Sequence, residues 1–125
     1  TADGLLAVQR SDGFLAGQLR SDWSAAATWA CLTGIAQIAH CWLMLYSDTG
    51  DVRYREAGLR GNAYVRRTVA IGGRADLRGA VRGSFPIDGA YCRYAYPNWA
   101  TKFLIDSLLL EHDVRSTGAR TVVTS

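Results

Sequence analysis

The longest uncharged stretch is the feature that most limits how this chain can fold. No Asp, Glu, Lys or Arg occurs between Asp22 and Asp48, and residues 28–46 are apolar nearly all round. A helix of this kind has to be covered on most of its sides, by protein or by lipid. Gln37 and His40 lie in the middle of the stretch, and neither flank carries a basic cluster. These features argue against a membrane span and predict a buried core helix over residues 28–46.

A turn and a second helix follow directly. Gly50 suits the left-handed conformation that ends a helix, and Asp51 is a favoured residue for capping the next one. Residues 52–69 place small and apolar side chains on one face, and the other face carries three arginines at seven-residue spacing: Arg53, Arg60 and Arg67. The pattern predicts an antiparallel helical hairpin with an amphipathic outer helix.

Two glycines interrupt this second helix. Gly58 and Gly61 lower its helix propensity, a loss tolerated mainly where a neighbouring backbone comes close. We therefore expect the two helices of the hairpin to approach each other closely at these positions.

The remaining segments complete an all-α prediction. Residues 70–89 are rich in glycine and predict a long loop, whereas residues 98–114 are strongly apolar and predict a second inner helix. Leu5, Leu6 and Val8 resemble the last turn of a helix that ends near Gln9, and residues 116–125 are expected to be frayed. Residues 1–125 are predicted to form one helical-hairpin domain or a fragment of a larger array.

An internal similarity points to neighbouring units. Trp29-Ala30 and Trp99-Ala100 stand seventy residues apart, and each pair is expected to open an apolar helix. Repeats of this sort cannot bury their apolar faces alone. We expect the missing neighbours to come from another copy of the chain or from further hairpins of a longer chain, and the former predicts self-association.

Charge and cysteine content exclude some partners and cofactors. The net charge is only +3, with thirteen arginines and one lysine, which argues against a nucleic-acid-binding role. Cys31, Cys41 and Cys92 form no CxxC pattern, so neither a zinc site nor a complete disulfide framework is predicted. These cysteines favour a reducing compartment. The first residues also lack the pattern of a secretory signal, and we expect a cytoplasmic location. No cofactor is predicted.

Three groups of residues are candidates for a functional role. Thr33, Gln37 and His40 form a polar stripe at i, i+4 and i+7. This stripe lines a cavity, or it is hydrogen-bonded within the core. Lys102 and Asp106 are four residues apart and predict a partly buried structural ion pair rather than a catalytic lysine.

The third group is an aromatic segment with charged residues in it. Residues 85–99 contain five aromatic side chains beside Asp88 and Arg93: Phe85, Tyr91, Tyr94, Tyr96 and Trp99. Aromatic faces with a carboxylate and a guanidinium suit a sugar ring or a carbocation. A loop anchored over hairpin ends would use the same residues, so a binding platform and an anchor are both open.

Several motifs together resemble bacterial proteins of the α/α-toroid class. They are Cys31-Leu32-Thr33-Gly34, Thr49-Gly50-Asp51, Gly83-Ser84-Phe85-Pro86 and Asn98-Trp99-Ala100. The turn Gln9-Arg10-Ser11-Asp12-Gly13-Phe14 is similar to the Gln-and-glycine turn of squalene cyclases. The class includes squalene-cyclase-like and prenyltransferase-like domains and six-hairpin carbohydrate-active enzymes. The resemblance implies an incomplete barrel of α/α-toroid type, with a site at the mouth of the inner helices.

The chemistry of those enzymes is not evident in the residues. No Asp-x-Asp-Asp motif of a squalene-type cyclase occurs, and Asp88, Cys92 and His112 are not at the spacing of a prenyltransferase zinc site. We assign no catalytic residue. The prediction is a domain that binds a saccharide-like or partly apolar, isoprenoid-like ligand through Asp88, Tyr91, Tyr94, Tyr96, Gln37 and His40. The alternative is a non-catalytic helical interaction module that self-associates.

Overall fold

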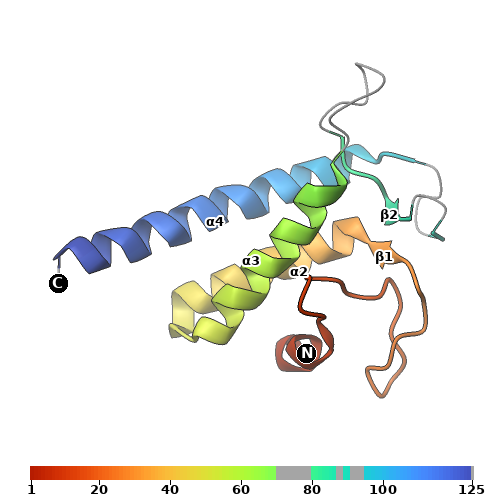
Figure 1. The fold of residues 1–125 in the computed structure, drawn as a ribbon, viewed down its shortest axis with the longest axis horizontal. Helices are drawn as coiled ribbons and strands as arrows, with labels where there is room; N and C mark the ends of the chain where they lie inside the picture. The colour runs from red at the N-terminus through yellow and green to blue at the C-terminus, as the bar shows by residue number, and fades with distance from the viewer. Residues whose placement is uncertain (70–79, 87–88, 91–94, 125) are drawn as a thin grey trace.

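The computed structural model describes residues 1–69, 80–86, 89–90 and 95–124, with side chains described as far as Ser116. In chain order the elements are α1 (Ala2–Val8), β1 (Ala30–Cys31), α2 (Leu32–Thr49), α3 (Val52–Thr68), β2 (Ser84–Phe85) and α4 (Asn98–Thr124) (Figure 1). Helices account for most of the described chain, so the all-α class is confirmed at this coarse level.

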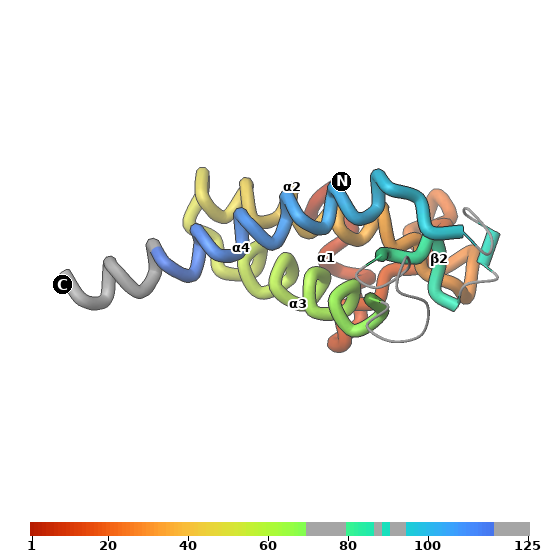
Figure 2. The backbone as a smooth tube through the Cα atoms, turned by 90° about the horizontal axis from the view of Figure 1, so that it is seen from above, coloured from red at the N-terminus to blue at the C-terminus, as the bar shows by residue number. Residues whose placement is uncertain are grey.

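The three longer helices form two layers. α2 and α4 start at the same end of the molecule and run in the same direction, whereas α3 runs back between them (Figure 1). Seen from above, α2 and α4 lie on one side and α3 on the other (Figure 2). α2 packs against both α3 and α4. The largest fully buried apolar side chains are Trp42, Leu32, Ile35, Leu43, Val65 and Val81.

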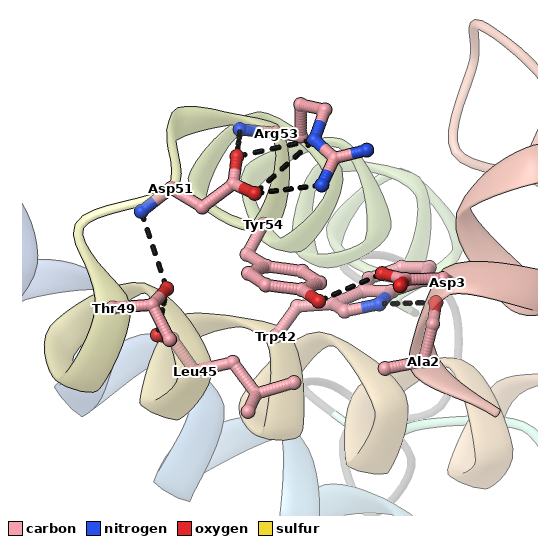
Figure 3. Close-up of polar contacts among 8 residues, drawn as sticks. All are labelled: Ala2, Asp3, Trp42, Leu45, Thr49, Asp51, Arg53 and Tyr54. Carbon is pink, nitrogen blue, oxygen red and sulfur yellow. Dashed lines mark hydrogen bonds and ion pairs between the residues drawn. The ribbon is translucent and has the colours of Figure 1, made fainter.

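The predicted α2–α3 hairpin is confirmed in detail. Gly50 adopts the left-handed conformation with φ of +73° and ends α2. The Asp51 carboxylate caps α3 by accepting a hydrogen bond from the Arg53 backbone N–H at 3.0 Å, and it also binds the Arg53 guanidinium at 2.7 Å (Figure 3). These hydrogen bonds lower the pKa of the Asp51 carboxyl.

The close approach expected at the helical glycines is also present. A Cβ at Gly58 would lie 2.7 Å from Leu43 Cγ and 3.1 Å from the Ala39 carbonyl oxygen, and one at Gly61 would lie 3.2 Å from Ala39 Cβ. The glycines therefore let α3 pack at short distance on α2.

A buried polar network joins α3 to α4. Asn62 Nδ2 donates to the Ser107 carbonyl oxygen at 3.3 Å and to Glu111 Oε1 at 3.2 Å, and Ser107 Oγ donates to Asn62 Oδ1 at 2.6 Å. Glu111 Oε2 accepts from Arg66 Nη1 at 2.9 Å. Asn62 and Ser107 are fully buried, so these bonds fix how α4 lies on α3.

The N-terminal segment is attached to the hairpin by polar contacts. The predicted helix end is confirmed, since α1 ends at Val8. Trp42 Nε1 donates to the Ala2 carbonyl oxygen at 3.3 Å, and Tyr54 Oη donates to Asp3 Oδ1 at 2.7 Å (Figure 3). The bond to Asp3 raises the pKa of Tyr54.

The turn after α1 is held against α3. Gln9 Nε2 donates to the Ala57 carbonyl oxygen at 3.0 Å, and Gln9 Oε1 accepts from Arg60 Nε at 3.2 Å. Gly13 has φ of +96° and lies directly on the Arg60 carbonyl. The turn thus depends on a glycine at position 13.

The helix predicted over residues 28–46 begins later than expected. Residues 28–31 were predicted to be helical, but Ala30–Cys31 is a strand that pairs antiparallel with Ser84–Phe85, with Ala30 opposite Phe85. The Gly17 N–H also donates to the Trp29 carbonyl oxygen at 2.8 Å. These pairings hold the backbone extended up to Cys31, whose Sγ accepts from the Gly34 N–H at 3.4 Å and caps α2.

The other boundaries differ less. α3 ends at Thr68, one residue before the predicted end, and α4 starts at the predicted Asn98 but continues to Thr124 rather than Val114. Strand β2 lies inside the segment predicted as an irregular loop.

Candidate functional site

A groove of about 490 Å³ lies along the first two turns of α4. Seven residues line it: Ala80, Tyr96, Asn98, Thr101, Lys102, Ile105 and Asp106. Five of them belong to α4 and follow the i, i+3, i+4 periodicity that puts side chains on one helical face. The groove therefore combines one face of α4 with the chain segments on either side of β2.

Backbone contacts fix the segments beside the groove. The Gly83 N–H donates to the Ala95 carbonyl oxygen at 3.0 Å, and the Val81 N–H donates to Thr101 Oγ1 at 3.2 Å. Because Thr101 Oγ1 accepts that bond, its hydroxyl hydrogen can donate to a ligand. These contacts hold the wall of the groove in place.

Lys102 and Asp106 form the predicted ion pair, with Nζ and Oδ2 2.6 Å apart. The Lys102 side chain is 65% exposed and that of Asp106 38% exposed, so the expectation that burial would force the pairing is wrong. Lys102 Nζ also lies 5.1 Å from the centroid of the Phe103 ring. Both charged groups are open to the groove, where an ammonium offers donors and a carboxylate offers acceptors.

Tyr96 is the predicted site residue that the structure places in this groove. It is half-buried, and the Arg82 guanidinium carbon lies 5.8 Å from the centroid of its ring. Arg82 also donates to the Thr68 carbonyl oxygen at the end of α3. Arg82 thus links α3 to Tyr96.

Three predicted site residues, Asp88, Tyr91 and Tyr94, lie outside the described residues. Tyr96 is described and lines the groove. The choice between a binding platform and an anchoring loop stays a prediction.

The polar stripe of α2 is only partly satisfied. Gln37 is exposed, His40 is half-buried and Thr33 is buried. Thr33 Oγ1 and His40 Nδ1 are buried atoms that find no hydrogen-bond partner in the described part of the chain. Buried polar atoms are normally paired. Among the residues that the structure describes, the hydrogen bonds expected of a core stripe are not found for these two atoms.

Gln37 and the groove share one side of the molecule. On α2, Ile35, Ala39 and Leu43 face the glycines of α3. On α4, Ser107 and Glu111 face α3, where both contact Asn62. Helical periodicity puts the opposite sides of α2 and α4 away from α3. Those sides carry exposed residues, and we call them the uncovered face: Gln37, Cys41 and Met44 of α2 with Lys102, Ile105 and Leu109 of α4.

Asn98 and Thr101 complete the polar lining but were not among the predicted ligand residues. Their spacing from Lys102 and Ile105 was the available signal, since all four residues lie on one helical face. What the spacing could not show is that residues 80 and 96 close the groove on its other side.

Comparisons with known proteins found no match. A scan against models of protein families found no match, and searches of curated proteins and of solved structures returned no significant similarity.

Across the part of the chain that the structure describes, no helix combines the length and hydropathy needed to cross a membrane. Among the same residues, no cluster of three or more His, Cys, Asp or Glu side chains is arranged to hold a metal ion.

Proposed function

We propose that this chain is a helical-hairpin domain of α/α-toroid type that binds a saccharide-like ligand in the groove at the start of α4. The observation that carries the proposal is the convergence of Tyr96, Asn98, Thr101, Lys102 and Asp106 on one concavity. We assign it no catalytic residue.

The lining has the chemistry that a hydroxylated ring requires. An amide, a hydroxyl, an ammonium and a carboxylate supply donors and acceptors for sugar hydroxyls. Tyr96 supplies an aromatic surface, and Ile105 supplies an apolar one for the C–H groups of the ring. Gln37, on the same uncovered face, adds a second amide on α2.

The helix arrangement supports the toroid part of the proposal. In such an array, inner helices run parallel to one another and outer helices return between them. α2 and α4 have the parallel relation and α3 the antiparallel one (Figure 1). The uncovered face then corresponds to the inner side of the array, and the groove to its mouth.

A fluorescence titration tests ligand binding. Trp99 is exposed and follows Asn98, so saturable quenching by neutral oligosaccharides is expected, and Trp99→Phe should remove it. Prenyl alcohols provide the comparison for an apolar ligand. Tyr96→Ala and Asp106→Ala should each weaken binding by about tenfold, roughly 1.4 kcal/mol. Val52→Ala, on the outer side of α3, is the control.

A flat titration with every oligosaccharide and prenyl alcohol would refute this proposal. So would binding that Tyr96→Ala and Asp106→Ala leave unchanged. Saturable binding of prenyl alcohols alone would replace the saccharide with an apolar ligand.

A second candidate function is self-association, and the apolar part of the uncovered face favours it. Met44 and Ile105 are each 51% exposed and Leu109 is 62% exposed. Exposed aliphatic side chains gathered on one face are typical of contact surfaces. Sedimentation velocity at micromolar concentration should show a dimer or larger species, and Leu109→Lys should shift it toward monomer. A monomer at every concentration tested would contradict this candidate.

A further inference from the structure

The outer face of α3 carries an excess of positive charge that the proposed ligand groove does not use. α3 contains five arginines and one glutamate, a net charge of +4, whereas the whole chain carries +3. The rest of the chain is therefore slightly acidic. The net positive charge of the chain therefore comes from this one helix.

Two of these arginines bind no carboxylate in the described structure. Arg53, Arg55 and Arg66 form ion pairs with Asp51, Glu56 and Glu111. Arg60 instead donates to the amide oxygen of Gln9 at 3.2 Å, and Arg67 donates to the Asp12 backbone carbonyl oxygen at 2.6 Å.

The two guanidinium groups are held in place without being neutralised. Arg67 also lies over the Tyr64 ring, with 5.7 Å between Cζ and the ring centroid. Side chains fixed in this way lose less conformational entropy when they bind an anion.

A narrow apolar stripe runs between the arginines. Val52 is 61% exposed, and Leu59 and Ala63 are half-buried, at i, i+7 and i+11. At 100° per residue, Arg53, Arg60 and Arg67 lie along one edge of this stripe, and Arg55 and Arg66 lie along the other. We call this set of residues the α3 seam. Glu56, the acidic residue of the helix, is bound to Arg55.

We propose that the α3 seam is a docking surface for an acidic amphipathic helix of a partner protein. An apolar stripe flanked by like charges at heptad spacing is the arrangement by which one helix selects another of opposite charge. The partner helix would carry aliphatic residues on one face and Glu or Asp on both sides of them. This surface lies on the opposite layer from the groove, so it does not depend on the proposed ligand.

The observations favour a helix over a nucleic acid. Single-stranded nucleic acids need exposed aromatic rings for their bases to stack on. The aromatic residues of α3 are Tyr54, half-buried and hydrogen-bonded to Asp3, and Tyr64, which is 9% exposed. The seam offers aliphatic contact and charge instead.

The test uses a fluorescent synthetic helix of three heptads, with leucine along one face and glutamate on both flanks. The same peptide with lysine in place of every glutamate is the matched control. Fluorescence anisotropy with the full chain should show binding of the glutamate peptide that weakens as salt rises, and no binding of the lysine peptide. A single-stranded RNA oligonucleotide is the third probe.

Two variants locate the contact on α3. Arg60→Gln combined with Arg67→Gln should weaken binding of the glutamate peptide about tenfold, and the corresponding double Arg→Lys variant should weaken it less. Arg20→Gln, in the loop before β1, removes one positive charge away from α3. It should lower the affinity for the glutamate peptide only slightly, through the lower net charge. Circular dichroism melts check that each variant is folded.

Ala63→Arg separates docking from general attraction. This change adds positive charge to the seam but fills the stripe with a long side chain. Helix docking predicts weaker binding of the glutamate peptide, whereas unspecific electrostatic attraction predicts stronger binding. Stronger binding by Ala63→Arg, equal binding of both peptides, or binding of RNA but not of the glutamate peptide would overturn the proposal.

Discussion

The buried network between α3 and α4 provides the sharpest test of how the fold is held together. Asn62→Ala removes three hydrogen bonds, two donated by Nδ2 and one accepted by Oδ1. Each contributes about 0.5–1.5 kcal/mol, and the fully buried Ser107 hydroxyl loses its acceptor. The higher helix propensity of alanine offsets roughly 0.5 kcal/mol of this loss. The free energy of unfolding should fall by about 3 kcal/mol.

The assay is urea unfolding followed by circular dichroism at 222 nm. A loss of about 3 kcal/mol in a chain of this length corresponds to a decrease in Tm of roughly 10 °C. A double-mutant cycle with Ser107→Ala should show a coupling of about 1–2 kcal/mol, because the two side chains are 2.6 Å apart. Gln37→Ala, an exposed amide on α2, is the control and should stay within about 0.5 kcal/mol of wild type.

Two results would refute this reasoning. The first is a loss below about 1 kcal/mol for Asn62→Ala, which would mean that water or Glu111 compensates for the missing amide. The second is additivity of the Asn62 and Ser107 changes, which would mean that their hydrogen bond contributes nothing.

Three further predictions concern the turns and caps. Gly13→Ala should lower the free energy of unfolding by about 2 kcal/mol or more, because the residue has positive φ and its Cβ would overlap the Arg60 carbonyl. Gly50 also has positive φ, but a Cβ there would have no atom within 4 Å. Gly50→Ala should therefore cost only about 1 kcal/mol in the same urea assay. Asp51→Ala should cost about 1 kcal/mol through loss of the α3 cap, and Asp51→Ser should restore most of it. Hydrogen bonds from Arg10 and from the Phe14 N–H lower the pKa of Asp12 below 3.8, so the folded state gains stability from the ionised carboxylate above that pH and loses it as pH falls further. The stability difference between wild type and Asp12→Asn should therefore be present at pH 7 and shrink toward pH 2, and a difference that does not change with pH would contradict the assignment.

The sequence predicted the elements that depend on local signals. The α2–α3 hairpin followed from a glycine able to adopt positive φ, a capping aspartate and two faces of different polarity, all within one stretch of chain. Gly58 and Gly61 even indicated where the two helices touch.

Pairings between distant segments could not be read in the same way. Nothing near Ala30 indicates that it will pair with Phe85, so local helix propensity placed the start of α2 too early. Asn62, Ser107 and Glu111 look individually like surface residues of amphipathic helices. They become a buried network only because α4 lies against α3, and no short pattern encodes that placement.

In the candidate site, too, local patterns predicted single residues, whereas contacts between distant segments bring them together. Tyr96 was expected from its aromatic surroundings, and the Lys102–Asp106 pair from its spacing. These residues face one groove because two hydrogen bonds bring residues 80–83 beside α4. The Val81 N–H donates to Thr101 Oγ1, and the Gly83 N–H donates to the Ala95 carbonyl oxygen. Lys102 and Asp106 thereby line the groove as well as forming the predicted ion pair.

The uncovered face is not uniform along its length, and this decides how its two candidate functions relate. Lys102 and Asp106 lie at the start of α4, whereas Leu109 lies two helical turns, about 10 Å, beyond Lys102. Met44 lies at a corresponding depth along α2, seven residues beyond Gln37. The polar end of the face suits a hydroxylated ligand and the apolar end suits another protein surface, so the two proposals occupy adjacent halves. Ile105 belongs to both, because it lines the groove and is half exposed between Lys102 and Leu109. A change at Ile105 should therefore affect ligand binding and self-association together, whereas Leu109→Lys should affect self-association alone.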